Sequence, residues 1–326
     1  MPPLLAFFLR RIVTALPVLA VVLVGSFLLL EAAPGDAVDA YVAQSGAMDA
    51  DQLAQLRQEW QLDEGPLHRF RAYASALVQG DLGWSTAFER RVGSVILERL
   101  PITLLLMGVA TALAFFLGSL LGVIAGANPG SFRDRFLSTT SLALYAVPGF
   151  WLGLVLIVIF AVDLRWLPIG GIESIASGKT GFSRMGDIGR HLILPVASLA
   201  MVYLALYLRL MRDQMNEVWR DPFVQALKAR GLSRNRIVWR HVARNAVLPV
   251  VTMLGLQAAA MLGGSVVVES VFAIPGFGRL AEEAVARRDT PLLLGVILCS
   301  AITVITVNLL VDLAYGKLDP RVRVGR

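Results

Sequence analysis

Six long apolar runs constrain the fold more than any other feature of this chain. Each has about 20 residues, the length that an α-helix needs to cross roughly 30 Å of hydrocarbon at about 1.5 Å per residue. The runs cover residues 12–30, 102–127, 136–162, 192–211, 250–271 and 292–313. In lipid every backbone polar group needs an internal partner, so such runs form helices. We therefore predict an all-α membrane protein with six transmembrane helices.

The composition agrees with this class. Hydrophobic residues make up 56% of the 326 residues, and the mean hydropathy is +0.66. The net charge of +6 is typical of membrane proteins that collect Lys and Arg on the cytoplasmic side, so we expect a lipid bilayer and no nucleic acid as partner. The single cysteine, Cys299, and three scattered histidines predict no disulfide, no metal site and no catalytic residues.

Basic residues predict the orientation. They are frequent before the first run, between the second and third, between the fourth and fifth, and after the sixth. By the positive-inside rule these segments are cytoplasmic, which places both termini in the cytoplasm. A signal peptide is the alternative for the first run, but this run is longer than the usual apolar core of such a peptide.

The segment at about 31–99 would then lie outside. Asp49 and Gln52 form a capping-box start, and apolar residues follow at helical spacing. Gly65 and Pro66 end this helix and open a second one. Its apolar stripe is Leu67, Phe70, Ala74 and Leu77. We predict a small helical cap on the outer face, with an unstructured spacer as the alternative.

The segment 213–247, here called the basic loop, joins the fourth and fifth runs. Asp221 and Pro222 are typical of a helix start, and Gly231 of a helix end. A second basic helix follows, and Pro249 opens the fifth span. Two short helices hinged at a glycine form a lever, so we predict that a cytoplasmic protein binds here and moves the spans. The candidate contact residues are Phe223, Gln225, Ala226, Leu227, Lys228, Arg230, Gly231, Leu232, Arg236 and Arg240. The alternatives are a plain positive-inside loop, a helix on anionic lipid and a site for a soluble regulator.

The spacing from Gln225 to Gly231 resembles the EAA loop of bacterial ABC importer permeases. The form with His241 and Asn245 before Pro249 is similar to the dipeptide, oligopeptide and nickel branch of that family, and the large first outer loop resembles its "B"-type subunit. Further stretches resemble the same branch along nearly the whole chain: residues 80–83, 148–153, 166–168, 268–272, 275–278, 288–291 and 318–321.

The resemblance implies a type I ABC importer fold. It implies a first span and extracytoplasmic helical region at 1–94, a permease core at 95–316 that contains the coupling loop 213–247, and a cytoplasmic tail at 317–326. It also implies a non-catalytic subunit of the bacterial inner membrane without a cofactor of its own. Two cytoplasmic ATPase subunits would bind ATP and Mg, beside a second homologous permease and an extracytoplasmic substrate-binding protein. Accordingly, the sequence has no G-x-x-x-x-G-K-[ST] phosphate loop.

Di- or oligopeptides are the expected cargo. The alternatives are a nickel chelate, glutathione, an opine or a sugar, and a secondary transporter is the alternative from another class. Polar groups in lipid are costly and often functional, and broken helices border cavities. The pore or gate candidates are Glu269, Gln257, Ser265 and Pro148. An interfacial side chain, interhelical hydrogen bonds and a simple kink are the competing interpretations. Close helix packing is expected at Gly255, Gly263 and Gly264.

Overall fold

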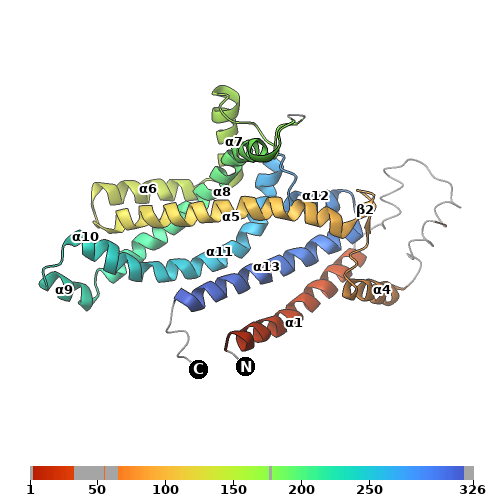
Figure 1. Cartoon of the computed structure of the whole chain (residues 1–326), viewed down its shortest axis with the longest axis horizontal. Helices are drawn as coiled ribbons and strands as arrows, with labels where there is room; N and C mark the ends of the chain where they lie inside the picture. Colours follow the sequence, from red (N-terminus) through yellow and green to blue (C-terminus); the bar gives the residue numbers. More distant parts are fainter. Residues whose placement is uncertain (1–2, 33–54, 56–64, 176–177, 319–326) are drawn as a thin grey trace. The chain divides into compact units, whose positions relative to one another are not determined.

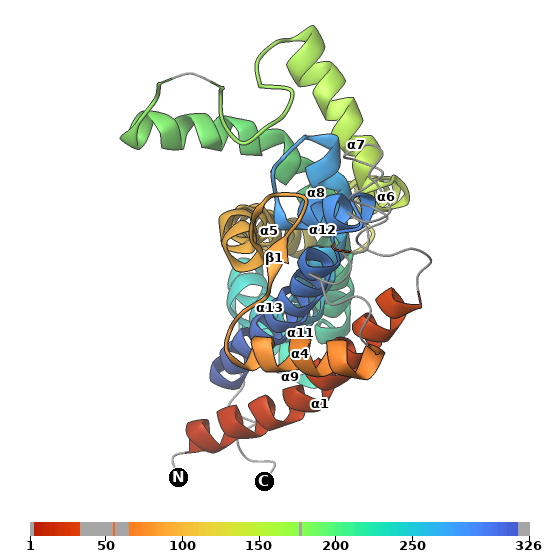
Figure 2. The ribbon, with the colours of Figure 1, turned by 90° about the vertical axis from the view of Figure 1, so that its right-hand side faces the viewer.

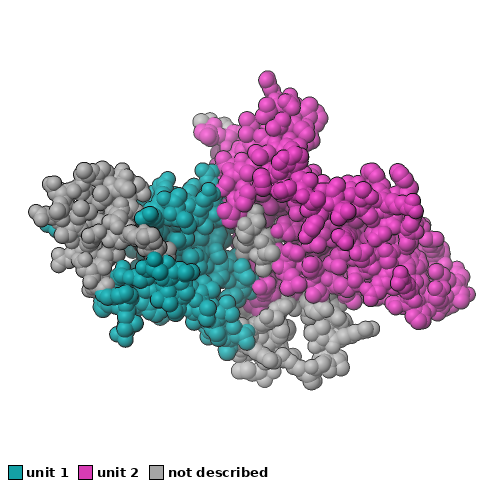
Figure 3. Space-filling view, turned by 180° about the vertical axis from the view of Figure 1, so that it is seen from behind, with its two compact units in different colours: residues 1–102, 276–306 teal, residues 103–275, 307–326 magenta. Residues whose placement is uncertain are grey.

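The computed structural model describes residues 3–32, 55, 65–175 and 178–318 (Figure 1). The described residues are mostly helical, with one short antiparallel hairpin. Two compact units divide the chain (Figure 3): residues 1–102 with 276–306 form unit 1, and residues 103–275 with 307–326 form unit 2. The predicted helix around 49–60 falls outside the described residues.

Unit 1 is built from segments far apart in the sequence. Its elements are α1 (Pro3–Glu31), α4 (Pro66–Val78), β1 (Trp84–Ser85), β2 (Arg90–Arg91), the start of α5 (Val92–Gly126), α12 (Phe277–Ala286) and most of α13 (Thr290–Leu318). Trp84 pairs with Arg91 in the hairpin. The core consists of Val92, Val95, Ile96, Phe277, Leu280, Ala284, Leu292 and Val296. The predicted helix after Gly65 is confirmed by α4.

Unit 2 holds the rest of α5 and the helices that follow. These are α6 (Phe132–Ala146), α7 (Gly149–Leu156), the π-helical η1 (Ile157–Asp163), α8 (Gly181–Val218), α9 (Pro222–Ala229), α10 (Arg234–Arg236), the π-helical η2 (Ile237–Val242) and α11 (Ala243–Val271). Buried residues of α8, α9, η2 and α11 form one apolar cluster together with Ala114 and Val123 of α5. Through this cluster the helices of the basic loop pack against α8 and α11.

Three described helices are long and apolar enough to cross a membrane: Val92–Ala127, Gly181–Val218 and Thr290–Val311. The pair Phe132–Ala146 and Gly149–Asp163 passes the same test as a broken span, bent by 99°; the turn of α7 away from α6 is visible in Figure 2. The bend occurs where Pro148 interrupts the third apolar run, because a proline disfavours helical backbone in the residue before it. The runs at 12–30 and 250–271 lie in α1 and α11. The full count of six spans stays a prediction.

Pro249, which the sequence predicts to open the fifth span, does not begin a helix. Pro249 lies inside α11, and the helical backbone is continuous from Arg234 through η2 to Val271. A proline removes one backbone hydrogen bond, and apolar helices tolerate this loss when their surroundings compensate it. The second helix of the basic loop therefore continues into α11 without a break.

Candidate functional site

The basic loop folds as a helix–turn–helix between α8 and α11. Pro222 takes the first position of α9 after Asp221, although the Asp221 side chain makes no capping hydrogen bond. Gly231 has φ of +76°, in the left-handed region that favours glycine at a helix end. Its N–H donates to the Lys228 carbonyl at 2.9 Å. The chain reverses here as the sequence predicts.

Apolar side chains anchor this helix–turn–helix to α8. Val224 of α9 and Val242 of η2 are fully buried. They share a cluster with Ile237, Val238, and Met211, Met215 and Val218 of α8. Val224 is not among the contact residues predicted from the sequence, although its spacing of three residues from Leu227 indicates a shared helix face. Residues of α9 and η2 are thus packed on α8.

Most of the predicted contact residues are exposed. Leu227 and Leu232 are the half-buried exceptions and pack against the apolar cluster. Lys228 is exposed but lies over the ring of Trp219. The remaining side chains, here called the exposed set, are Phe223, Gln225, Ala226, Arg230, Arg236 and Arg240. In the described part of the chain no carboxylate forms an ion pair with the three arginines of this set. Their charge is available to an acidic partner.

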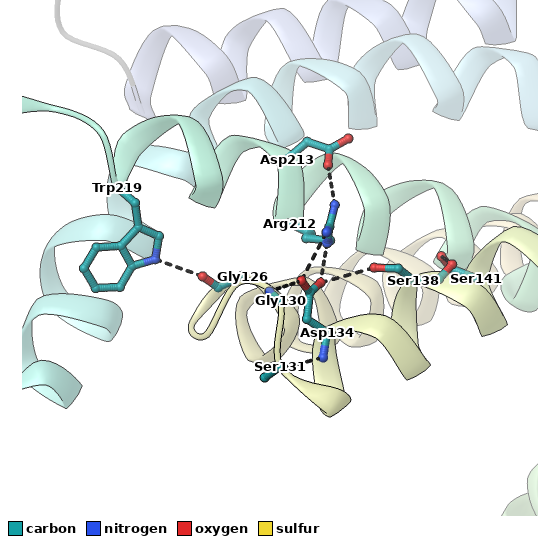
Figure 4. A network of polar contacts seen from close by, with 9 residues as sticks. All are labelled: Gly126, Gly130, Ser131, Asp134, Ser138, Ser141, Arg212, Asp213 and Trp219. Carbon is teal, nitrogen blue, oxygen red and sulfur yellow. Dashed lines mark hydrogen bonds and ion pairs between the residues drawn. The ribbon is translucent and has the colours of Figure 1, made fainter.

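A buried ion pair joins α6 to α8 close to the basic loop (Figure 4). Two nitrogens of the Arg212 guanidinium donate to the almost fully buried carboxylate of Asp134. Asp134 also accepts from the Gly130 N–H at 2.8 Å and from the Ser138 hydroxyl at 3.3 Å. The Ser131 hydroxyl caps α6 by accepting from the Asp134 N–H. The turn between α5 and α6 is thus tied to α8.

Glycines bring α5 directly against α8. A Cβ on Gly118 would lie 2.7 Å from the Leu204 carbonyl oxygen, one on Gly122 2.6 Å from Met211 Cβ, and one on Gly126 2.5 Å from Met215 Cβ. Residues four apart share one face of a helix, so these glycines form one contact line. These three glycines are not among the positions where close packing was expected, although small residues at this spacing are a known signal for it. Gly255, which is among those positions, packs against Val311.

Three sequence stretches meet at Phe272, which is 1% exposed at the end of α11. The Gly171 N–H donates to the Phe272 carbonyl at 2.8 Å. A Cβ on Gly170 would lie 2.4 Å from the same oxygen, and one on Gly153 3.0 Å from the Phe272 ring. The stretches 148–153 and 268–272 and the chain after 166–168 are therefore neighbours in space.

The chain between η1 and α8 is held by charged contacts. Asp187 accepts from the Ser174 N–H at 2.7 Å and from the Lys179 ammonium at 2.5 Å. The Arg184 guanidinium binds the Glu173 carboxylate at 2.6 and 3.1 Å. Hydrogen bonding from Arg184 holds the pKa of Glu173 below its ordinary value.

The pore candidates lie in different places. Glu269 and Ser265 are fully buried one turn apart on α11, and the Thr103 hydroxyl donates to Glu269 at 2.6 Å. Gln257 is half-buried nearer the start of the same helix. Pro148 is exposed and precedes α7. The structure therefore gives Glu269 an interhelical partner and does not place it at a surface.

The comparisons with known proteins agree on one family. The family described as "Binding-protein-dependent transport system inner membrane component" matches residues 118–324. The chain is 35% identical to the oligopeptide transport system permease protein AppB of Bacillus subtilis, over 97% of this chain and 99% of that protein. It is 36% identical to the di/tripeptide transport system permease protein DppB of Pseudomonas aeruginosa, over 99% and 100%.

A solved structure supports the fold. An inward-facing form of the MetNI methionine ABC transporter superposes with a TM-score of 0.56 at 16% identity, covering 69% of this chain and 96% of that one. At this identity the likeness concerns the fold alone. The family match covers more than half of the chain, and relatives above 30% identity span nearly all of it. The chain therefore belongs to the family of inner-membrane components of binding-protein-dependent transport systems.

Proposed function

We propose that this chain is the permease subunit of an ATP-driven importer that carries di- and oligopeptides across the bacterial inner membrane. The observation that carries the proposal is the folded basic loop. It exposes Arg230, Arg236 and Arg240, which form no ion pair among the described residues, while its apolar side is buried against α8. The names of the relatives AppB and DppB support peptides as the cargo.

The basic loop is the contact for a cytoplasmic ATPase subunit. The importer has two such subunits, which bind ATP and Mg and perform the hydrolysis. Their closure displaces α9 and η2. Because α9 and η2 are packed on α8 and η2 continues into α11, both long helices follow. Alternating access is then a two-state equilibrium that ATP biases on the inner side and a loaded binding protein on the outer side. The chain itself needs no catalytic residue or cofactor.

The proposed topology has six spans, cytoplasmic termini and a helical cap outside that contains α4. A second homologous permease completes the pathway, and Glu269, Gln257, Ser265 and Pro148 remain the pore and gate candidates. The domain division at 94 and 316 belongs to the same proposal.

The test is reconstitution of the whole importer. The chain is co-expressed with candidate ATPases, a candidate second permease and a candidate binding protein, purified as a complex, and placed in proteoliposomes with a labelled dipeptide. Uptake should require both ATP and the binding protein, with ADP-loaded vesicles as the control. Uptake by the chain alone, or a purified complex that never contains an ATPase, would refute the proposal. ATP-dependent uptake of a different solute, without peptide uptake, would refute the cargo alone.

A further inference from the structure

Side chains of the basic loop hold the C-terminal end of α5. The last carbonyls of a helix have no partner within the helix. At the end of α5 two of them find partners: the Trp219 indole N–H donates to the Gly126 oxygen at 2.9 Å (Figure 4), and the Arg234 guanidinium donates to the Ala127 oxygen at 3.0 Å. A cation at this end of a helix is also favoured by the helix dipole.

The same groups bind one another. The Lys228 ammonium nitrogen lies 5.2 Å from the centroid of the Trp219 ring, and the guanidinium carbon of Arg234 lies 5.8 Å from it. Cations at these distances from an indole are attracted by its π-electrons. Trp219, Lys228 and Arg234 line a depression of about 460 Å³. Its other lining residues are Pro129, Leu232 and Ile237. We call Trp219, Lys228 and Arg234 the α5 clamp.

The clamp connects the basic loop to a helix that is not its neighbour in the sequence. The loop continues directly from α8 and into α11, whereas α5 ends at Gly126, far earlier in the chain. The absence of a side chain at Gly126 lets α5 touch Met215 of α8. Next to this contact, Trp219 and Arg234 donate hydrogen bonds to the Gly126 and Ala127 carbonyls. Trp219 precedes α9 in the sequence and Arg234 follows it.

We infer that Trp219 is a positioning residue which, with Lys228 and Arg234, makes the end of α5 move together with the basic loop. This inference rests on the proposed function, in which the ATPases displace that loop. The indole contributes in two ways: its N–H bonds to α5, and its ring orders the two cations of the loop. Trp219→Phe separates these contributions, because phenylalanine keeps an aromatic ring and lacks the N–H.

The first experiment uses the complete importer in proteoliposomes. In Trp219→Phe and in Arg234→Met we expect the number of peptides taken up per ATP hydrolysed to fall about five-fold, the effect of losing one hydrogen bond, while the complex still assembles and hydrolyses ATP. The matched control is Trp84→Phe, at a 56% exposed tryptophan in unit 1. Unchanged coupling in both clamp variants overturns the inference.

The second experiment distinguishes a moving connection from a local cap. Spin labels are placed at Ser233 in the basic loop and at Leu117 on α5, both exposed, after Cys299→Ser. The wild-type distance should be the same without nucleotide and with vanadate-trapped ADP, whereas Trp219→Phe should change it between these states. A constant distance in the variant overturns the inference even if coupling falls. A wild-type complex that hydrolyses ATP without uptake would instead refute the proposed function.

Discussion

At the scale of single residues, Asp134 shows how a charge is kept inside this chain. Its carboxylate is almost fully buried and receives hydrogen bonds from Arg212, Gly130 and Ser138. A buried charge is tolerated only where such partners replace water. Arg212 comes from α8, so the pair holds the start of α6 against α8 at the end nearest the basic loop.

Asp134→Asn should lower the free energy of unfolding by about 3 kcal/mol, because Arg212 then keeps a charge without its main counter-charge. Thermal unfolding in detergent measures this loss. The matched control is Asp213→Asn: Asp213 binds the same guanidinium at 3.1 Å but is 51% exposed, so its loss should stay below about 1 kcal/mol. Equal losses in the two variants would contradict the importance of burial.

Gly231 makes a second prediction at this scale. A Cβ at Gly231 would meet nothing within 4 Å, so only its φ of +76° opposes substitution. Gly231→Ala should cost about 1 kcal/mol and leave most of the uptake. Gly231→Pro is incompatible with this turn, since the ring fixes φ near −65°, and should abolish ATP-driven uptake while the protein still inserts. Normal uptake by the proline variant would argue strongly against the lever.

At the scale of elements, the contact between α5 and α8 depends on missing side chains. The spacing of Gly118, Gly122 and Gly126 places them all on the face toward α8. Shape complementarity drives helix association in lipid, where the hydrophobic effect contributes little. A single methyl group added in this contact line should therefore lower the stability of the protein.

We expect Gly122→Ala to destabilise the protein by about 2 kcal/mol, because the new methyl would lie 2.6 Å from both the Leu208 oxygen and Met211 Cβ. Gly108→Ala on the same helix is the control. It has nothing within 4 Å, so alanine should be neutral or stabilise by up to about 1 kcal/mol through its higher helix propensity. Thermal unfolding of both variants measures the two changes in stability. Equal changes would mean that α5 does not pack against α8 as described.

The second helix of the basic loop gives another prediction for an element. Arg236 and Arg240 are exposed one turn apart and should face acidic groups of the ATPase. Arg236→Glu with Arg240→Glu should weaken ATPase binding more at low salt than at high salt, because ions screen exposed charges. Binding is measured by co-purification over a salt series, with Arg91→Glu in β2 as the control. A salt-independent effect would show that the two arginines face solvent in the complex.

At the scale of the whole molecule, the chain consists of two units, and unit 1 is closed by residues far apart in sequence. Asp289 is fully buried and accepts from the Ser85 hydroxyl at 2.5 Å, the Ala87 N–H at 3.0 Å and the Leu292 N–H at 3.1 Å. It therefore both caps α13 and holds the hairpin segment, which lies about 200 residues earlier. Arg287 adds a bond to the Ala87 carbonyl.

Asp289→Ala should loosen unit 1 and leave unit 2 unchanged. We expect a local loss of about 2 kcal/mol from the missing cap and hydrogen bonds. Hydrogen exchange should become faster at 83–91 and 289–295 and stay constant in α6, α8 and α9. Asp81→Ala is the control, because among the described residues its exposed carboxylate accepts a local bond from the Gly83 N–H and no other. Faster exchange throughout unit 2 would contradict the division into units.

The sequence by itself determined what depends on neighbours along the chain. Long apolar runs predicted the helices, Pro148 the broken third run, and Gly231 the turn of the basic loop, because chain length in lipid and backbone φ are local requirements. The same reasoning did not show that the helix continues through Pro249, because the local preference of proline argues against it. Only the tertiary structure decided which residues meet: Lys228 lies over Trp219, Val224 anchors α9, and the glycines of α5 fit against α8. Such contacts depend on which distant segment arrives at each face, and a pattern read along one segment does not contain that information.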